Sequence, residues 1–257
     1  IASSIMSKKL ASGSDAIVLD VKTGNGAFMK DLEDSVALAE EMVSIGTMAG
    51  KKTAAVITDM DQPLGYAVGN ALEVLEALDT LEGRGPGDFQ EVVFALGSLM
   101  LQFAGKAGDD AKARAMMESV IADGSAKKKF AEFIEAQGGD AAPVFDHSLL
   151  TLAQTVVPVA AERGGYVHRI LAEDIGIACM SLGGGRETKE SAIDLSVGIV
   201  LKKKNGDAVE AGDTLAVIYG NDDAKIARAK ELILGAYEIC DDPAEKQPVI
   251  RKYIFAE

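Results

Sequence analysis

Two short, unbroken apolar segments constrain the fold of this chain most strongly. They are AIVLDVK at 16–22 and TAAVITDM at 53–60. Apolar runs of this length, without polar alternation, are typical of strands covered on both faces, as in a parallel sheet. A loop and a helical apolar pattern follow each segment, at 32–45 and 67–81, and these helices supply the covering layers. We therefore predict an α/β fold with a mostly parallel sheet flanked by helices.

The pattern changes near residue 150. Helical spacing continues through 90–104, 109–123 and 126–137, whereas shorter β-branched runs broken by glycine follow, with a last strand at 253–255. The segment VGIVLKKKNGDAVEAGDTLAVIYG at 197–220 alternates strand patterns with two Gly-Asp turns, like the half-barrel of biotinyl and lipoyl domains. It lacks the M-K-M hairpin tip of a carrier domain. We therefore expect a smaller α+β C-terminal domain in which this half-barrel is scaffold.

Composition excludes several classes of function. The net charge of −14 argues against non-specific binding to nucleic acid or anionic membranes, because both need a basic surface. A small anionic substrate stays possible, because a local basic pocket can lie inside an acidic protein. We find no apolar run of the roughly 18 residues that a membrane span needs. Two cysteines, Cys179 and Cys240, and two histidines, His147 and His168, are too few for a disulfide scaffold or a zinc site. We expect Cys179 to be buried and both histidines to be structural or solvated without acidic neighbours. We expect the protein to be an acidic, soluble, cytosolic enzyme or one of its domains.

Ser4 and Lys8 form the first candidate site. In the helix predicted at 4–11 they lie one turn apart on one face. A lysine is a compact cation suited to a carbonyl oxygen that gains charge, and a serine hydroxyl both donates and accepts. On spacing alone, however, such a pair is usually a solvated helix face, so both interpretations stay open at this point.

Several separated motifs resemble the pyrimidine-nucleoside phosphorylase family. They are SSIMSKKLASGSDAIVLDVKTGNGAFM at 3–29, GGYVHRILAEDIG at 164–176, LGGGRETKESAID at 182–194 and VGIVLKKKNGD at 197–207. The resemblance implies reversible phosphorolysis: phosphate converts a pyrimidine (deoxy)ribonucleoside, such as thymidine or uridine, to the free base and (deoxy)ribose 1-phosphate. It also implies a cytoplasmic homodimer that acts in pyrimidine salvage.

The resemblance assigns roles to particular residues. Ser4 and Lys8 would contact the pyrimidine and carry catalysis, because donors aimed at the charge of the leaving base lower the barrier. Ile1 and Phe28 would form apolar walls around the base. Potassium would be bound by the backbone carbonyls of Leu64 and Ala67 and the carboxylate of Glu76. On sequence alone Glu76 would count as a solvated charge.

The sequence also departs from the family. It has neither the phosphate loop K-H-S-x-G-G-x-G-D nor the segment R-D-V-T-A-T. We therefore expect a C-terminal part of a longer enzyme, inactive alone, with an incomplete potassium site. Its expected parts are a remnant of the small helical domain at 1–12, an α/β portion at 13–150 and the C-terminal domain at 151–257.

Alternative functions remain. A related phosphoribosyltransferase, such as anthranilate phosphoribosyltransferase, is disfavoured because those enzymes lack the half-barrel tail. A non-catalytic binding or carrier module would need the hairpin lysine that is absent here. A structural remnant without a function of its own is the last alternative for the chain as it stands.

Overall fold

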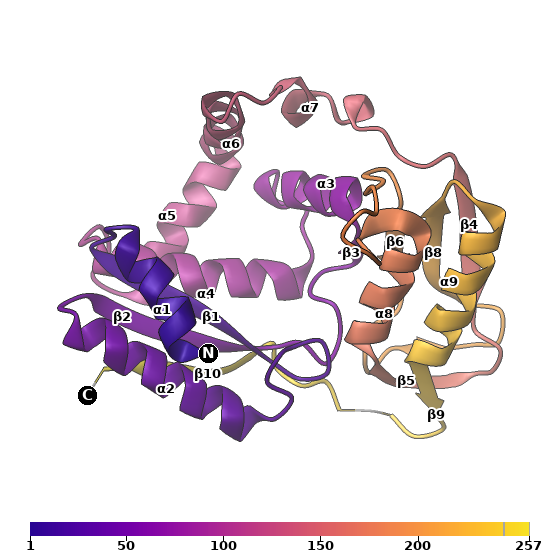
Figure 1. The fold of residues 1–257 in the computed structure, drawn as a ribbon, viewed down its shortest axis with the longest axis horizontal. Helices are drawn as coiled ribbons and strands as arrows, with labels where there is room; N and C mark the ends of the chain where they lie inside the picture. The colour runs from indigo at the N-terminus through magenta and orange to yellow at the C-terminus, as the bar shows by residue number, and fades with distance from the viewer. Residues whose placement is uncertain (244, 257) are drawn as a thin grey trace. The chain divides into compact units, whose positions relative to one another are not determined.

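The computed structural model describes residues 1–243 and 245–256, which form two compact units built from interleaved segments (Figure 1). Unit 1 comprises Ile1–Met60, Gly87–Ala122 and Pro248–Glu257, and unit 2 comprises Asp61–Pro86 and Asp123–Gln247. The chain thus enters each unit more than once. The division at residues 12 and 150 follows the family resemblance and stays a prediction.

A three-stranded sheet organises unit 1. Its order is β1-β2-β10, with β1 at Ala16–Thr23, β2 at Lys52–Asp59 and β10 at Ile250–Phe255. β1 and β2 are parallel along their whole length, in agreement with the prediction, whereas β10 is antiparallel to β2. The α/β class is confirmed, but this sheet is mixed and not mostly parallel. The sequence predicts a last strand at 253–255, yet its pairing with β2 depends on a contact that local sequence does not encode.

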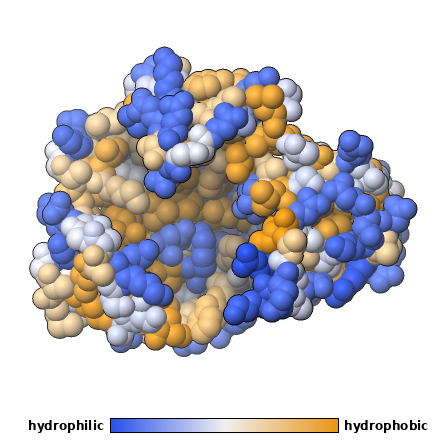
Figure 2. Space-filling model, turned by 45° about the horizontal axis from the view of Figure 1, so that its top comes forward, coloured by the Kyte–Doolittle hydropathy of each residue, from blue (hydrophilic) through white to orange (hydrophobic). Residues whose placement is uncertain are grey.

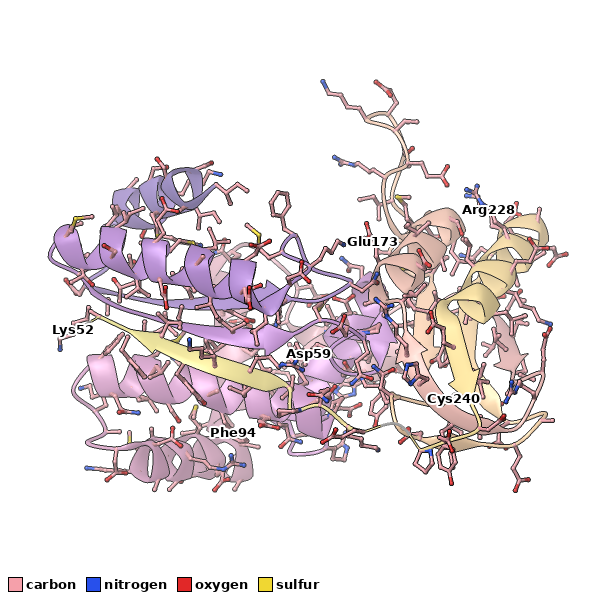
Figure 3. All side chains as sticks on the ribbon, turned by 90° about the horizontal axis from the view of Figure 1, so that it is seen from below. Lys52, Asp59, Phe94, Glu173, Arg228 and Cys240 are labelled. Carbon is pink, nitrogen blue, oxygen red and sulfur yellow. The ribbon has the colours of Figure 1, made fainter. Side chains whose placement is uncertain are left out.

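Helices cover both faces of this sheet. α1 (Ala2–Ala11) and α2 (Leu32–Met48) lie on one face, and α4 (Gly87–Phe103), backed by α5 (Asp110–Ala122), lies on the other. In β2, Ala55 and Ile57 pack toward α2, while Ala54 and Val56 pack toward α4. Figure 3 shows the strands between the two helical layers, with Lys52 and Asp59 at opposite ends of β2. This double burial explains the unbroken apolar run.

Unit 2 contains two small antiparallel sheets. The four-stranded sheet has the order β3-β6-β8-β4 and the three-stranded sheet the order β7-β5-β9. Gly206 and Gly212, both at positive φ, form the predicted turns between β6, β7 and β8. The bounds of the strands are β3 Ala67–Val68, β4 Thr155–Ala160, β5 Gly165–Ile170, β6 Gly198–Leu201, β7 Ala208–Val209, β8 Thr214–Gly220 and β9 Tyr237–Cys240.

One helix of unit 2 lies where the sequence pattern indicates strand-like runs. α8 (Ala172–Cys179) begins with Glu173 and Asp174, which favour a helix N-terminus, and it buries Ile175, Ala178 and Cys179 on one face. It packs against α9 (Asp223–Ala236) beside the sheets. The remaining helical segments of unit 2 are α3 Asn70–Leu81, α6 Ser125–Ala136, α7 Ala142–Phe145, η1 His147–Leu149 and η2 Met180–Gly184.

Hydrophilic and hydrophobic side chains are interspersed on the face shown in Figure 2. Within the part of the chain that the structure describes, no helix is both long enough and apolar enough to cross a membrane.

Candidate active site

Helix α1 presents Ser4 and Lys8 on one exposed face. Its opposite face carries Ala2 and Met6, which are 2% and 0% exposed and belong to the core between α2 and the sheet. A ten-residue helix is marginal by itself, so this packing is what holds it. Ser4 and Lys8 are therefore two polar side chains on a fixed backbone, one turn apart, in agreement with their spacing.

Ile1 and Phe28 are not core residues. The two residues are 60% and 79% exposed, so neither is buried in unit 1. Burial in the core is the usual role of such residues, and here the structure excludes it. The exposure of Phe28 leaves its ring accessible to a ligand.

The loop that carries Phe28 is a tight turn at the carboxyl end of β1. Gly24, at φ +115°, accepts a hydrogen bond from the N–H of Ala27, and the N–H of Gly26 donates to Met60 beyond the end of β2. This confirms the interpretation of Thr23–Gly26 as a strand-to-helix turn.

The structure also contains a polar cluster near the same edge of the sheet, which was not predicted from the sequence. The Lys22 ammonium lies 2.9 Å from the Thr58 hydroxyl and 2.7 Å from Asp20, and the Thr58 hydroxyl donates to Asp20 at 2.5 Å. Asp20 and Lys22 are two residues apart on β1, so both face the same side, and the parallel register places Lys22 beside Thr58. The carboxyl edge of a parallel pair is where α/β folds commonly bind ligands. In the sequence, the two charged residues at the end of an apolar run are the pattern that could have indicated this cluster.

In unit 2, Glu76 reaches back from α3 to the loop before β3. One carboxylate oxygen, Oε1, accepts from the backbone N–H groups of Tyr66 and Ala67 at 2.9 and 3.0 Å. The structure therefore brings Glu76 to the segment that contains Leu64 and Ala67. The candidate ligand atoms here are all oxygens, which suits a hard cation such as potassium.

Comparisons with known proteins agree with these features. A family model described as "Glycosyl transferase family, a/b domain" matches residues 2–127, and one described as "Pyrimidine nucleoside phosphorylase C-terminal domain" matches residues 166–240. The chain is 59% identical over 221 residues to a pyrimidine-nucleoside phosphorylase of Geobacillus stearothermophilus and 56% identical to one of Bacillus subtilis. A protein of the same name from Staphylococcus haemolyticus is 55% identical.

The chain belongs to the pyrimidine-nucleoside phosphorylase family. Each alignment covers 86% of this chain and 51% of the relative, so the chain spans about half the length of the curated relatives it matches. The match over residues 2–127 includes Ser4, Lys8, Phe28 and Glu76. The separate match over 166–240 covers β6, β7, β8, β9 and nearly all of β5, whereas β3 and β4 lie outside it.

A second cluster of titratable groups includes His147, which lies outside the residues matched by either family model. Its imidazole Nε2 is 3.6 Å from Glu82, and Asp79 completes the cluster, with ligand atoms within 4.8 Å of one another. The expectation that His147 has no acidic neighbour was wrong, because the fold brings Glu82, which is distant in sequence, next to it.

Cations already hold this cluster. Lys127 pairs with Glu82, and Arg84 pairs with Asp79 at 2.6 Å and with Glu82 at 2.5 Å. The Lys127 ammonium holds the pKa of Glu82 below its usual range. A metal ion would have to displace these cations, so we interpret the cluster as an ionic link between the end of α3 and α6, with His147 of η1 beside it.

Cys179 is a buried thiol, in agreement with the prediction, at 5% exposure. Burial raises its pKa to about 11, and its Sγ lies 3.5 Å from the carbonyl of Val68. A nucleophilic cysteine needs an accessible thiolate, so this residue is structural.

Proposed function

We propose that this chain takes part in the reversible phosphorolysis of pyrimidine (deoxy)ribonucleosides, with thymidine and uridine as substrates and phosphate as co-substrate. The products are a free base and (deoxy)ribose 1-phosphate, which makes the protein a pentosyltransferase of pyrimidine salvage. The observation that carries the proposal is the Ser4–Lys8 pair, exposed on a helix anchored by Met6, in a chain of this family.

The reaction sets specific demands on those residues. The bond between the anomeric carbon and the ring nitrogen breaks, a phosphate oxygen bonds to that carbon, and the electron pair moves onto the pyrimidine. The sugar passes through an oxocarbenium-like state, as in glycoside cleavage. A cation near the ring oxygens binds this state more tightly than it binds the substrate. We assign that role to Lys8, and we assign to Ser4 the hydrogen bonds to the ring imide and its neighbouring oxygen.

Ile1 and Phe28 complete the proposed base site as apolar walls. Phe28 is exposed in unit 1, which supports a role toward a ligand over a role in the core. An apolar surface on a flat ring excludes water from the reacting bond, which strengthens the electrostatic effect of Lys8.

Potassium is the proposed cation of the loop at 64–67. Leu64 and Ala67 would bind it through backbone carbonyls, and Glu76, already at this loop, would bind it through its carboxylate. When bound, the ion would offset the carboxylate charge and fix the loop.

Further features of the family are proposals for this chain. They are a homodimeric state, a cytoplasmic location, the half-barrel arrangement of 197–220 and the domain division at residues 12 and 150. A phosphoribosyltransferase is the second candidate, but the match of residues 166–240 to a phosphorylase C-terminal domain favours the first.

The test measures release of free base from thymidine and uridine in the presence of phosphate. It compares this chain with a version extended upstream to the full length of its relatives, and it compares Lys8→Ala with Lys9→Ala in the extended protein. We expect base release from the extended protein, abolished by Lys8→Ala and retained by Lys9→Ala. An extended protein inert on both nucleosides, or equal effects of the two substitutions, would overturn the proposal.

A further inference from the structure

Three consecutive lysines after β6 have three different environments. Lys202 is exposed, and Lys203 is half-buried, with its ammonium held by the carbonyl of Ala208 and by Asp213. Lys204 is buried at 8% exposure. An ammonium group is costly to bury unless it is fully compensated, so the surroundings of Lys204 must supply that compensation.

The loop before β3 supplies part of this compensation. The Lys204 ammonium donates to the backbone carbonyls of Pro63 and Gly65, the latter at 2.6 Å, and it lies 5.4 Å from the centre of the Tyr66 ring. Carbonyl oxygens and an aromatic face are the groups that bind monovalent cations in proteins.

Two neighbouring hydrogen bonds also join the loop before β3 to the segment around Lys204. The N–H of Asn205 donates to the Gln62 side chain at 3.0 Å, and the N–H of Leu201 donates to the carbonyl of Tyr66 at 2.8 Å. On the α3 side, the carboxylate of Glu76 accepts hydrogen bonds from the backbone N–H groups of Tyr66 and Ala67. A fixed cation thus holds loop carbonyls while a fixed anion holds loop amides.

We propose that the carbonyls of Pro63 and Gly65 and the ring of Tyr66 form a second monovalent-cation site, filled by the tethered ammonium of Lys204. The oxygens of this site alternate along the loop with those of Leu64 and Ala67, which are proposed for potassium. Lys204 is therefore a positioning residue: it orders the loop that presents the potassium ligands, without touching substrate.

If this site exists, small cations in solution should restore the order of the loop in a variant that lacks the Lys204 ammonium. Lys204→Ala removes the ammonium and leaves space, so ammonium or potassium ions in solution can enter and restore the loop. Lys204→Met removes the charge but fills the space, so the same ions cannot restore it. Lys204→Arg keeps the charge, and Lys202→Ala removes an equivalent exposed charge as the matched control.

The experiment measures amide hydrogen exchange across residues 62–68 in the whole chain, with the amides of β2 as an internal reference in unit 1. For Lys204→Ala we expect exchange at Tyr66 and Ala67 to be faster by about tenfold. Millimolar ammonium or potassium chloride should reverse this change, and choline chloride should not. Lys204→Met should stay fast in every salt, and Lys202→Ala should match the original protein.

Unchanged protection in Lys204→Ala, or lost protection that no cation restores, would overturn the proposal. If Lys204→Ala unfolds unit 2, the comparison of Lys204→Met with Lys204→Arg decides: protection retained only by arginine supports the cation site, and equal behaviour rejects it. The inference concerns the loop of the proposed potassium site but rests on contacts of Lys204. Because exchange needs no nucleoside, its outcome is separable from that of the base-release assay.

Discussion

The carboxylate of Glu76 packs directly against Gly65. A Cβ placed on residue 65 would lie 2.1 Å from Oε2, while Oε1 is held by the amides of Tyr66 and Ala67. Gly65 also has φ +69°, a conformation that side chains disfavour. The loop can therefore approach Glu76 only because residue 65 has no side chain.

Gly65→Ala should lower the free energy of unfolding by about 3 kcal/mol, from backbone strain plus displacement of a hydrogen-bonded carboxylate. Gly105→Ala is the matched control, because Gly105 has φ +67° with open space around its Cβ position. It should cost only the strain, about 1 kcal/mol. Denaturant unfolding of both variants measures the difference, and equal losses would show that the contact with Glu76 is unimportant.

Ser4→Ala should reduce kcat/KM for thymidine by about 10- to 100-fold in the extended protein, since it would remove the hydrogen bond to the base that we propose for Ser4. Ser4 is exposed, so the unfolding midpoint should not change. Ser3→Ala, at the adjacent exposed position, should leave both quantities unaltered. Steady-state kinetics and denaturant unfolding give the two readouts. A comparable kinetic loss in Ser3→Ala would argue against a specific role for Ser4.

Two helical glycines of unit 1 should respond differently to alanine. A Cβ on Gly46 of α2 would lie 2.2 Å from Oγ1 and 2.9 Å from Cβ of Thr53, an atom that cannot move without the backbone of β2. A Cβ on Gly97 of α4 would meet the flexible end of Met117. Gly46→Ala should therefore cost about 2 kcal/mol, whereas Gly97→Ala should be near neutral because alanine favours helix. Thermal unfolding of the pair checks this order, and the reverse order would refute it.

Acid should weaken the link at Glu82. Its pKa is lowered chiefly by Lys127, so its contribution to stability is complete above the ordinary glutamate pKa of about 4.3 and is lost as pH falls through the lower folded value. The urea midpoint of the original protein should therefore fall more steeply below about pH 4.3 than that of Glu82→Gln. Parallel pH profiles for the two proteins would contradict this.

The two cysteines should differ in reactivity. Cys179 is buried with its pKa raised to about 11, whereas Cys240, on β9 (Figure 3), is half-buried. Iodoacetamide at neutral pH should modify Cys240 first, and Cys179 only after denaturation, because the thiolate is the reactive form. Mass spectrometry of the digested protein locates the label. Early labelling of Cys179 would show that unit 2 opens readily.

Much of the local structure follows from local sequence. The runs at 16–22 and 53–60 correspond to β1 and β2 within one residue at each end, because a strand covered on both faces is mostly apolar, and the charged Asp20 and Lys22 lie toward the end of β1. The i, i+4 spacing of Ser4 and Lys8 is sufficient to place both side chains on one helix face. These features depend on neighbours within a few residues.

Pairings between distant segments do not follow from local sequence. Arg251 lies 3.3 Å from Asp59 across 192 residues because β10 returns to β2, and no periodicity encodes that return. The contact of His147 with Glu82 and the polar cluster of Asp20, Lys22 and Thr58 arise in the same way. Each depends on which elements meet, which is a property of the packed chain.

Lys202, Lys203 and Lys204 illustrate this division most directly. The order of residues is enough to predict the α/β class, the main strands and helices, the resemblance to the phosphorylases and a turn at this lysine run. Identical neighbouring residues, however, carry no information that would separate one from another. The third lysine is buried against the carbonyls of Pro63 and Gly65 only in the packed protein, because burial of a charge depends on the acceptors that a distant segment brings to it.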